Sequence, residues 1–212
     1  MEFFILDTNI FFNMEAGLSL GEKTEDVVIR LTNIGRELNE NGKGKFFMTP
    51  GAVSEFLSFF DNKNKPFISD FLSVLTIESP DVSTIMLSGS IFYKLIEDIR
   101  ARSYRGLNIA EEEISAAALE FSDKKINERK DFQIKIGKYI KKFRDRYRNA
   151  TRTGFLDSVV DLDLIMLAKQ KRGFLVSTDE GVLSWGRTFG VKEMPSPAFA
   201  KRLESLLHSR RE

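Results

Sequence analysis

The chain has 212 residues, with 32 Lys and Arg against 31 Asp and Glu, and a formal net charge of +1. It contains no cysteine, which excludes disulfides, thiolate zinc sites and cysteine nucleophiles, and its one histidine, His208, lies near the end, which argues against a histidine base. Because it has no basic leader and no apolar run of about 18 residues, the sequence predicts a soluble, cytoplasmic protein that spans no membrane.

The N-terminal segment predicts a buried strand that ends at a carboxylate. Phe3–Leu6 is continuously apolar and is followed by Asp7-Thr8-Asn9. Ligands bind at the carboxyl ends of strands in open parallel sheets, which makes Asp7 a candidate ligand. Taken alone, Asp7 is equally well explained as a turn residue or a helix cap.

The next elements alternate between helix and strand. Apolar spacing predicts a helix over 24–39, a strand over 46–48, a helix that begins at Pro50 and a strand over 74–77. Glu55 lies among apolar residues of the Pro50 helix. It is either a surface acid, which is the simpler explanation, or a further metal ligand.

Residues 81–150 differ in pattern from the rest of the chain. They contain long helical patterns and no proline, which predicts an inserted helical hairpin or bundle within a catalytic domain formed by 1–80 and 151–212. Residues 123–152 carry twelve Lys and Arg against four acids, a local charge of +8 (12 − 4) that leaves −7 (1 − 8) for the remainder. Such a segment is either a solvated helix face or a surface that contacts phosphates.

The last third of the chain brings three carboxylates into an apolar segment. Asp157 reads as a helix N-cap, Asp161 lies one turn later, and Asp163 lies on another side of the same helix. Gly173 is expected to end this helix. A strand over 174–177 then leads to Asp179, which stands where Asp7 stands after its own strand. An edge strand over 191–194 and a closing helix over 197–207 complete the chain.

Alternating strands and helices predict an α/β fold with a parallel, doubly wound sheet. In such a sheet Asp7, Asp157, Asp161 and Asp179 can converge where the strand order reverses. Without His or Cys, the chemistry of such a site is that of one or two Mg²⁺ or Mn²⁺ ions held by oxygens, about 4 Å apart if two are bound. The expected reaction is phosphodiester hydrolysis to a 5'-phosphate and a 3'-hydroxyl.

The acidic motifs resemble those of the PIN-domain nucleases, and most closely those of the HARP family, the minimal protein-only ribonuclease P. The resemblance depends on Asp7-Thr8-Asn9, Glu55, the string from Leu156 to Ala168 and Ser177-Thr178-Asp179-Glu180-Gly181. Some members of that family are labelled RNA ligase partner proteins. The resemblance implies a PIN-like three-layer sandwich with a protruding helical domain, and a metallonuclease that removes the 5' leader of precursor tRNA.

The resemblance also assigns roles to particular positions. Asp7, Asp157, Asp161 and Asp179 match the family's catalytic, metal-binding acids, and Asp163 matches a further acid that is either a ligand or a supporting residue. It implies dimers that assemble into larger rings, and no nucleotide cofactor is expected. Basic side chains of the insertion are candidates for contact with tRNA: Lys138, Lys141, Lys142, Arg144, Arg146, Arg148 and Arg152.

Other functions stay open at this point. A less selective PIN endoribonuclease would share the same acids, and a non-catalytic RNA-binding or RNA ligase partner protein would use them as caps. A structural assembly subunit would use only the helical insertion. A haloacid dehalogenase phosphatase also begins with an acid after a strand, but it needs a second Asp where this chain has Asn9.

Overall fold

The computed structural model describes residues 1–12, 21, 23–122, 128–152, 156 and 158–208. The chain divides into two compact units. Unit 1 comprises Met1–Ser88 and Leu156–Glu212, and unit 2 comprises Gly89–Phe155.

Unit 1 is built on a parallel sheet of five strands in the order β3-β2-β1-β4-β5. The strands are β1 (Glu2–Leu6), β2 (Gly44–Met48), β3 (Leu75–Ile77), β4 (Phe174–Ser177) and β5 (Lys192–Pro195). The chain moves outward from β1 to β2 and β3, and later returns to place β4 on the other side of β1. The strand order therefore reverses between β1 and β4, which is where open α/β sheets form their ligand crevice.

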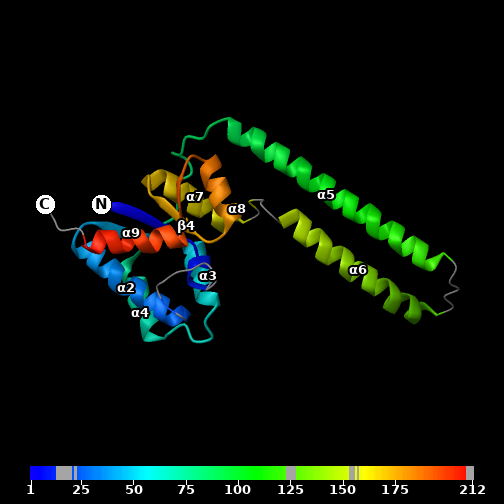
Figure 1. The fold of residues 1–212 in the computed structure, drawn as a ribbon, viewed down its shortest axis with the longest axis horizontal. Helices are drawn as coiled ribbons and strands as arrows, with labels where there is room; N and C mark the ends of the chain where they lie inside the picture. The colour runs from blue at the N-terminus through cyan, green and yellow to red at the C-terminus, as the bar shows by residue number, and fades with distance from the viewer. Residues whose placement is uncertain (13–20, 22, 123–127, 153–155, 157, 209–212) are drawn as a thin grey trace. The chain divides into compact units, whose positions relative to one another are not determined.

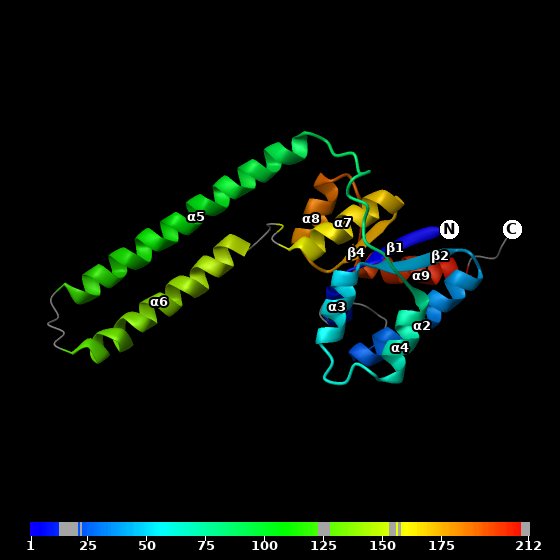
Figure 2. The same ribbon diagram turned by 180° about the vertical axis from the view of Figure 1, so that it is seen from behind.

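Helices cover both faces of this sheet (Figure 1). In unit 1 they are α1 (Asn9–Phe12), α2 (Thr24–Glu40), α3 (Pro50–Ser58), α4 (Pro66–Val74), α7 (Val159–Lys171), α8 (Glu180–Thr188) and α9 (Ser196–His208). Figure 2 shows α7 and α8 on one face, and α2, α4 and α9 on the other. The predicted α/β class with a central parallel sheet is confirmed.

The strands are short apolar runs because both faces of the sheet are covered. Phe4, Ile5 and Leu6 of β1 are fully buried. The Phe4 ring packs against Phe174 of β4 and against Phe199 of α9, with ring centroids 5.8 and 5.4 Å apart. Aromatic packing thus ties the central strand to its neighbour and to the helix layer behind it.

The structure adds one element to those expected and corrects both ends of a predicted helix. Helix α4 was not predicted, although Pro66 at its first position followed by Phe67, Ile68 and Phe71 is a helix-start pattern. Helix α7 is capped by Ser158, whose hydroxyl accepts from the Asp161 N–H, rather than by Asp157. Its last turn closes at Arg172, which adopts a left-handed φ of 52°, rather than at Gly173.

Unit 2 is a helical hairpin of α5 (Ser90–Phe121) and α6 (Arg129–Arg152). The helical pattern of the first half of the predicted insertion forms one long helix, α5. Where the helices approach closely, a methyl group at Gly106 would lie 2.6 Å from the Tyr147 ring, so a larger residue would force the helices apart. Among the described helices of the chain, none combines the length and apolar character that a bilayer crossing needs.

Candidate functional site

Two of the predicted acids lie at the carboxyl edge of neighbouring strands. Asp7 follows β1 and Asp179 comes two residues after the end of β4. The pairing of the strands continues to this point, because the Asp7 N–H donates to the Val176 carbonyl at 2.9 Å. The edge between β1 and β4 is therefore the place where both acids enter the crevice.

Ser177 joins these two positions. Its hydroxyl donates to Asp7 Oδ2 at 2.5 Å, and its oxygen accepts the backbone N–H of Asp179 at 2.9 Å. Asn9 adds two further donors to Asp7, from its side-chain amide at 3.2 Å and from its backbone N–H at 3.4 Å. Asp7 is thereby held in one orientation.

Asp7 is only 2% exposed, and burial raises its pKa above the ordinary value of 3.8. The hydrogen bonds from Ser177 and Asn9 oppose this rise, while the negative charge of Glu55 adds to it. A buried carboxylate that faces a second carboxylate is the electrostatic situation that a bound cation relieves.

Glu55 is directed toward this edge by Thr8. The Thr8 hydroxyl lies 3.2 Å from Glu55 Oε2 and 3.4 Å from the Ala52 carbonyl oxygen, so it links the end of β1 to helix α3. Glu55 is an exposed residue of α3, yet it is close enough to Asp7 to affect its pKa. Glu55 is therefore both a surface acid and a neighbour of the buried one.

The start of α7 brings Asp161 to the same edge of the sheet. Helix α7 packs against β1, and its first turn adjoins the first turn of α3, since a methyl group at Gly51 would lie 3.0 Å from Val160 Cγ2. Asp161 and Asp163 are both half-buried on α7. Asp157, the fourth predicted catalytic acid, lies outside the described residues.

Asp179 also has a structural role. Its Oδ1 accepts from the N–H groups of Gly181 at 2.7 Å and Val182 at 3.4 Å, which caps helix α8. Asp179 is therefore a helix N-cap as well as a candidate catalytic acid. Capping engages one carboxylate oxygen and orients the side chain.

The donor set at this edge consists of carboxylate oxygens, which suits a hard divalent cation such as Mg²⁺. In the described part of the chain, however, no three His, Cys, Asp or Glu side chains are grouped closely enough to hold an ion. Asp157 is outside that part of the chain. The case for a metal site at this edge therefore depends on the carboxylate donors present and on the buried charge of Asp7.

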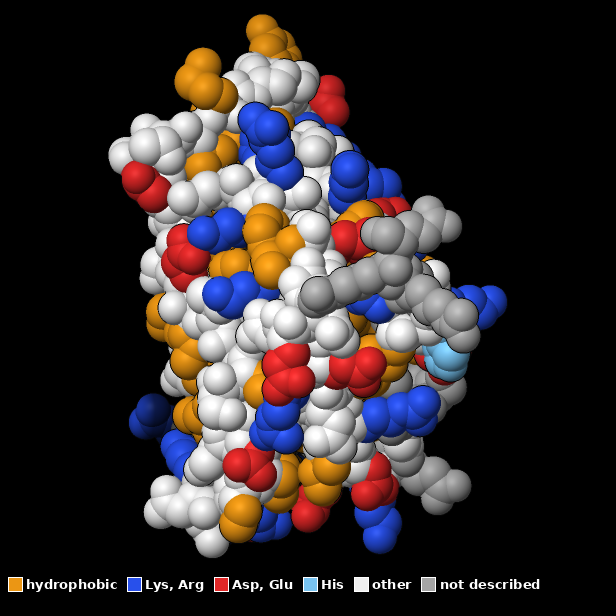
Figure 3. Space-filling model, turned by 90° about the vertical axis from the view of Figure 1, so that its left-hand side faces the viewer, with side chains coloured by type: hydrophobic (Ala, Val, Ile, Leu, Met, Phe, Trp, Pro, Cys, Tyr) orange, Lys and Arg blue, Asp and Glu red, His pale blue; other side chains and the backbone are white. Residues whose placement is uncertain are grey.

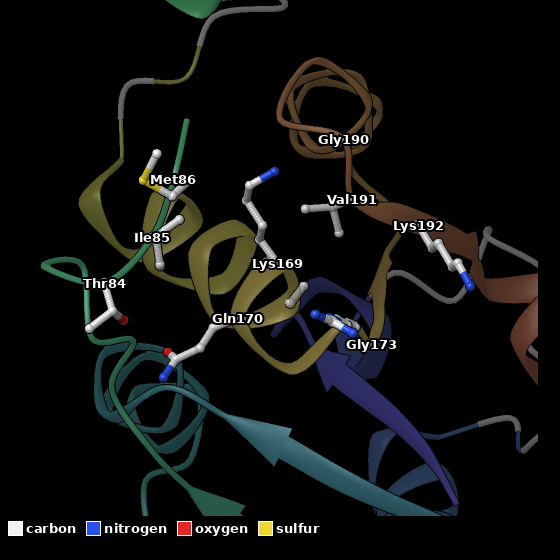
Figure 4. A pocket seen from close by; sticks show the side chains of 11 residues that line it. Thr84, Ile85, Met86, Lys169, Gln170, Gly173, Gly190, Val191 and Lys192 are labelled. Atoms are coloured by element: carbon white, nitrogen blue, oxygen red, sulfur yellow. The ribbon is translucent and has the colours of Figure 1, made fainter. Parts of the chain in front are cut away.

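A hollow of about 700 Å³ lies elsewhere in unit 1, at the amino ends of β4 and β5 (Figure 4). Thr84, Met86, Lys169 and Lys192 are among its lining residues, and none of the predicted acids lines it. The Lys169 ammonium donates to the Phe189 carbonyl at 2.7 Å. This hollow is thus at the opposite edge of the sheet from Asp7 and is not the candidate catalytic site.

The basic residues of α6 that were predicted to contact tRNA fall into two groups. Lys142 and Arg146 pair with Glu113 of α5 at 3.0 and 2.6 Å, and Arg146 also pairs with Glu112 at 2.6 Å, so both residues hold the hairpin together. The second group, Lys138, Lys141, Arg144 and Arg148, occupies exposed positions on α6, as Lys142 also does. The side chain of Arg152 is outside the described residues.

The charge distribution elsewhere differs from that of α6. On the face of the molecule drawn in Figure 3, the described basic and acidic side chains are interspersed. The concentrated positive charge of 123–152 in the sequence has no counterpart on that face.

Three residues of the site were not assigned a role from the sequence: Thr8, Asn9 and Ser177. Each is a small polar residue at the carboxyl end of a strand, next to an acid. That position was the available signal, since hydroxyl and amide groups there orient neighbouring carboxylates. Their contacts to Asp7 and Glu55 are visible only in the structure.

Comparison with known proteins places this geometry in a family. Residues 3–208 match the model of the PINc domain ribonucleases. Proteins named RNA-free ribonuclease P from Pyrococcus horikoshii, Staphylothermus marinus and Nitrosococcus oceani are each 32% identical to the chain. The alignments cover 96%, 98% and 97% of this chain and 92%, 96% and 96% of the respective relatives. The chain therefore belongs to the PINc domain ribonucleases, in the family of the RNA-free ribonuclease P proteins that its acidic motifs indicated.

Proposed function

We propose that this protein is an endoribonuclease that removes the 5' leader of precursor tRNA without an RNA subunit. The observation that carries the proposal is that Asp7 and Asp179 both follow strands at the edge where the strand order reverses, with Ser177 donating to the Asp7 carboxylate and accepting the Asp179 backbone N–H, in a chain similar over its length to RNA-free ribonuclease P proteins. A phosphodiesterase needs preorganised negative oxygens at one point, and these acids are proposed to provide them.

The reaction is proposed to depend on Mg²⁺ or Mn²⁺. PIN nucleases generally use divalent metals. Asp7, Asp157, Asp161 and Asp179 would hold one or two ions, with Asp163 or Glu55 as further ligands or supporting acids. When bound, such an ion favours the deprotonation of water and neutralises charge on the phosphate.

The protein's own groups prepare the site for this chemistry. Ser177 and Asn9 keep Asp7 ionisable despite its burial, because both donate hydrogen bonds to the carboxylate. Thr8 holds Glu55 toward the same edge. Together they position the acids before RNA binds, which lowers the reorganisation needed during the reaction.

Unit 2 is proposed to contact the body of the tRNA. Structured RNA is recognised mainly through its shape and backbone, and exposed Lys and Arg side chains on α6 suit phosphate contacts. Lys138, Lys141, Arg144 and Arg148 are the main candidates, since Lys142 and Arg146 are already paired within the hairpin. Assembly into dimers and larger rings, with the cytoplasm as location, belongs to the same proposal.

The test is incubation of the purified protein with end-labelled precursor tRNA, with Mg²⁺ or with EDTA, followed by mapping of the product ends. One cut at the mature 5' end that requires Mg²⁺ is expected, and Asp7→Asn and Asp161→Asn should each abolish it while leaving tRNA affinity unchanged. Uniform cutting of an unstructured RNA would favour a less selective endoribonuclease. RNA binding without any cleavage would favour a partner protein.

A further inference from the structure

A stacked pair of phenylalanines adjoins the catalytic edge. The rings of Phe12 and Phe59 have centroids 4.0 Å apart and an interplanar angle of 24°. Phe12 is the last residue of α1, which begins two residues after Asp7, and Phe59 follows the last residue of α3, the helix that carries Glu55. Residues from two separate segments therefore meet beside the acids.

Helical spacing sets the position of this pair. Phe12 lies four residues after Thr8, and Phe59 lies four residues after Glu55, so each ring is about one helical turn beyond its partner in the Thr8–Glu55 hydrogen bond. One turn of helix advances about 5.4 Å. The aromatic pair thus lies about one helical turn along α1 and α3 from the Thr8–Glu55 hydrogen bond.

The pair is anchored on its inner side and exposed on its outer side. Phe12 packs against Phe56 and Phe60, with ring centroids 6.1 and 5.9 Å away, and Phe56 is fully buried. Phe59 is 55% exposed although it is a large apolar side chain. A rigidly backed aromatic ring with an exposed surface is how proteins present a platform for stacking.

The surroundings of the platform suit RNA. The segment that follows α3 contains the exposed residues Lys63 and Lys65 against one acid, Asp61. Aromatic rings next to basic side chains are the usual composition of sites for single-stranded nucleic acid. A protein partner of apolar surface would make no use of these lysines.

The base that stacks on Phe59 has to be unpaired. Within a duplex both faces of a base are covered by its neighbours, and RNA-binding proteins stack aromatic side chains on bases of single-stranded segments. In a precursor tRNA, the nucleotides on the 5' side of the cleaved phosphate, which are absent from the mature tRNA, are those of the leader. This step depends on the proposed function.

We propose that Phe59, backed by Phe12, stacks on an unpaired base of the 5' leader next to the scissile phosphate. The contact is independent of sequence, because every base has a face to offer. It favours substrates that still carry a leader and leaves the mature tRNA without this contact, so it promotes product release after cleavage.

The test measures binding of wild-type protein, Phe59→Ala and Phe59→Trp to three RNAs, with Ca²⁺ replacing Mg²⁺ to prevent cleavage. The RNAs are a precursor tRNA, the same precursor with abasic residues at the two leader positions next to the cleavage site, and the mature tRNA. Phe59→Ala should weaken binding of the precursor about 10-fold, within the range of one base–aromatic stack, and leave the mature tRNA unaffected. Phe59→Trp should bind the precursor as well as wild type.

The abasic precursor completes a double-mutant cycle with Phe59→Ala. Wild-type protein should bind the abasic precursor about as weakly as Phe59→Ala binds the intact precursor. Phe59→Ala should bind both precursors equally, because the two changes remove the same interaction. Ile29→Ala, which truncates an apolar side chain of α2 that is 41% exposed, is the matched control and should bind like wild type. Thermal melts check that the variants are folded.

Other outcomes overturn the proposal. Equal losses for precursor and mature tRNA, additive losses with the abasic leader, unchanged binding of Phe59→Ala, or failure of Trp to restore binding would each exclude leader stacking. The abasic arm with wild-type protein keeps the test valid if Phe59→Ala does not fold. If wild type cuts at the mature 5' end but the Phe59 variants bind alike, only this inference fails; if wild type neither binds nor cuts the precursor, the proposed function fails as well.

Discussion

Among the described acids with a shifted pKa, Asp7 is the one whose environment disfavours its charge. It is buried beside β4, and the negative charge of Glu55 acts on it. Catalytic sites commonly contain such groups, because a charge that the fold solvates poorly is available to bind a ligand. This cost has a measurable consequence for stability.

We expect Asp7→Asn to stabilise the metal-free protein at neutral pH. Because the pKa of Asp7 is raised in the folded state, the unfolded chain releases this proton more readily, so the wild type loses stability as pH rises above the ordinary value of 3.8. The neutral amide avoids that loss. In EDTA at pH 7 the Tm should rise by about 2–4 °C, the shift that roughly 1 kcal/mol produces in a chain of this size.

The same comparison has an internal control. The gain should shrink as pH falls through the ordinary value of 3.8, below which Asp7 becomes neutral in both states, and it should also shrink when Mg²⁺ is added, because the ion would stabilise only the wild type. A lower Tm for Asp7→Asn in EDTA would show that the carboxylate is needed for folding and would contradict this explanation.

Ser177 is expected to act by positioning Asp7. Ser177→Ala removes a hydrogen bond that lowers the pKa of Asp7, so the acidic limb of the rate–pH profile should move to higher pH. Cleavage at neutral pH should slow by about 10-fold, as expected when a residue that orients a ligand is removed. The profile is measured with saturating precursor tRNA. Ser69→Ala on α4 is the control, and an identical profile for Ser177→Ala would contradict the positioning role.

At the scale of elements, the connection from α7 to β4 combines two constraints. Arg172 has a left-handed φ of 52°, and it is the one non-glycine residue of the described chain with a positive φ. Gly173 follows because a methyl group there would lie 2.7 Å from the Phe3 carbonyl oxygen and the Ile5 side chain. Glycine at position 173 thus permits the close approach of the chain to β1, and Arg172 adopts the strained left-handed conformation.

Arg172→Gly should therefore raise stability. Glycine adopts the left-handed region without steric cost, so we expect a gain of about 0.5–1 kcal/mol in the free energy of unfolding. Arg172→Ala is the matched control: it removes the same side chain and keeps the strain, so it should show no such gain. Both are measured by urea denaturation, and equal stability of the two variants would contradict the explanation.

Helix α5 contains a buried carboxylate at its contact with α6. Glu113 is only 4% exposed, and Arg146 and Lys142 hold its pKa below the ordinary value. Its Oε2 atom has no hydrogen-bond partner among the described residues. The hairpin is therefore held by charge pairs at its interface as well as by apolar packing.

At the scale of the whole molecule, positive charge and the candidate catalytic acids are located in different units. The basic helix α6 belongs to unit 2, and Asp7, Asp161 and Asp179 belong to unit 1. In the proposed function this division separates substrate binding, which needs cations, from hydrolysis, which needs carboxylates.

The division predicts how binding responds to salt. Replacing Lys138, Lys141 and Arg148 by Gln should weaken precursor tRNA binding and lower the slope of log affinity against log salt by about one for each phosphate that is no longer neutralised. Cleavage by the bound fraction should persist. The matched control replaces Arg36, Lys192 and Lys201 of unit 1 by Gln, with the same reduction of charge. Equal slope changes for both triples would show that net charge, rather than α6, binds the RNA.

The amino-acid sequence alone determined the class of the fold, because apolar runs such as Phe3–Leu6 and helical spacing are local patterns. It also identified the family through its acidic motifs. It did not predict that Ser158 caps α7 or that Arg172 takes the left-handed turn, because several neighbouring residues could fill each role, and at the second position the close approach of Gly173 to β1 decides.

The tertiary structure decided which side chains surround the acids. Ser177 and Asp7 are 170 residues apart in sequence, and Thr8 and Glu55 are 47 apart, so no local pattern could predict their hydrogen bonds. The stack of Phe12 on Phe59 was likewise outside the reach of periodicity, which treats each helix by itself. Contacts of this kind depend on the order and register of the strands, which bring distant segments of the chain to one edge of the sheet.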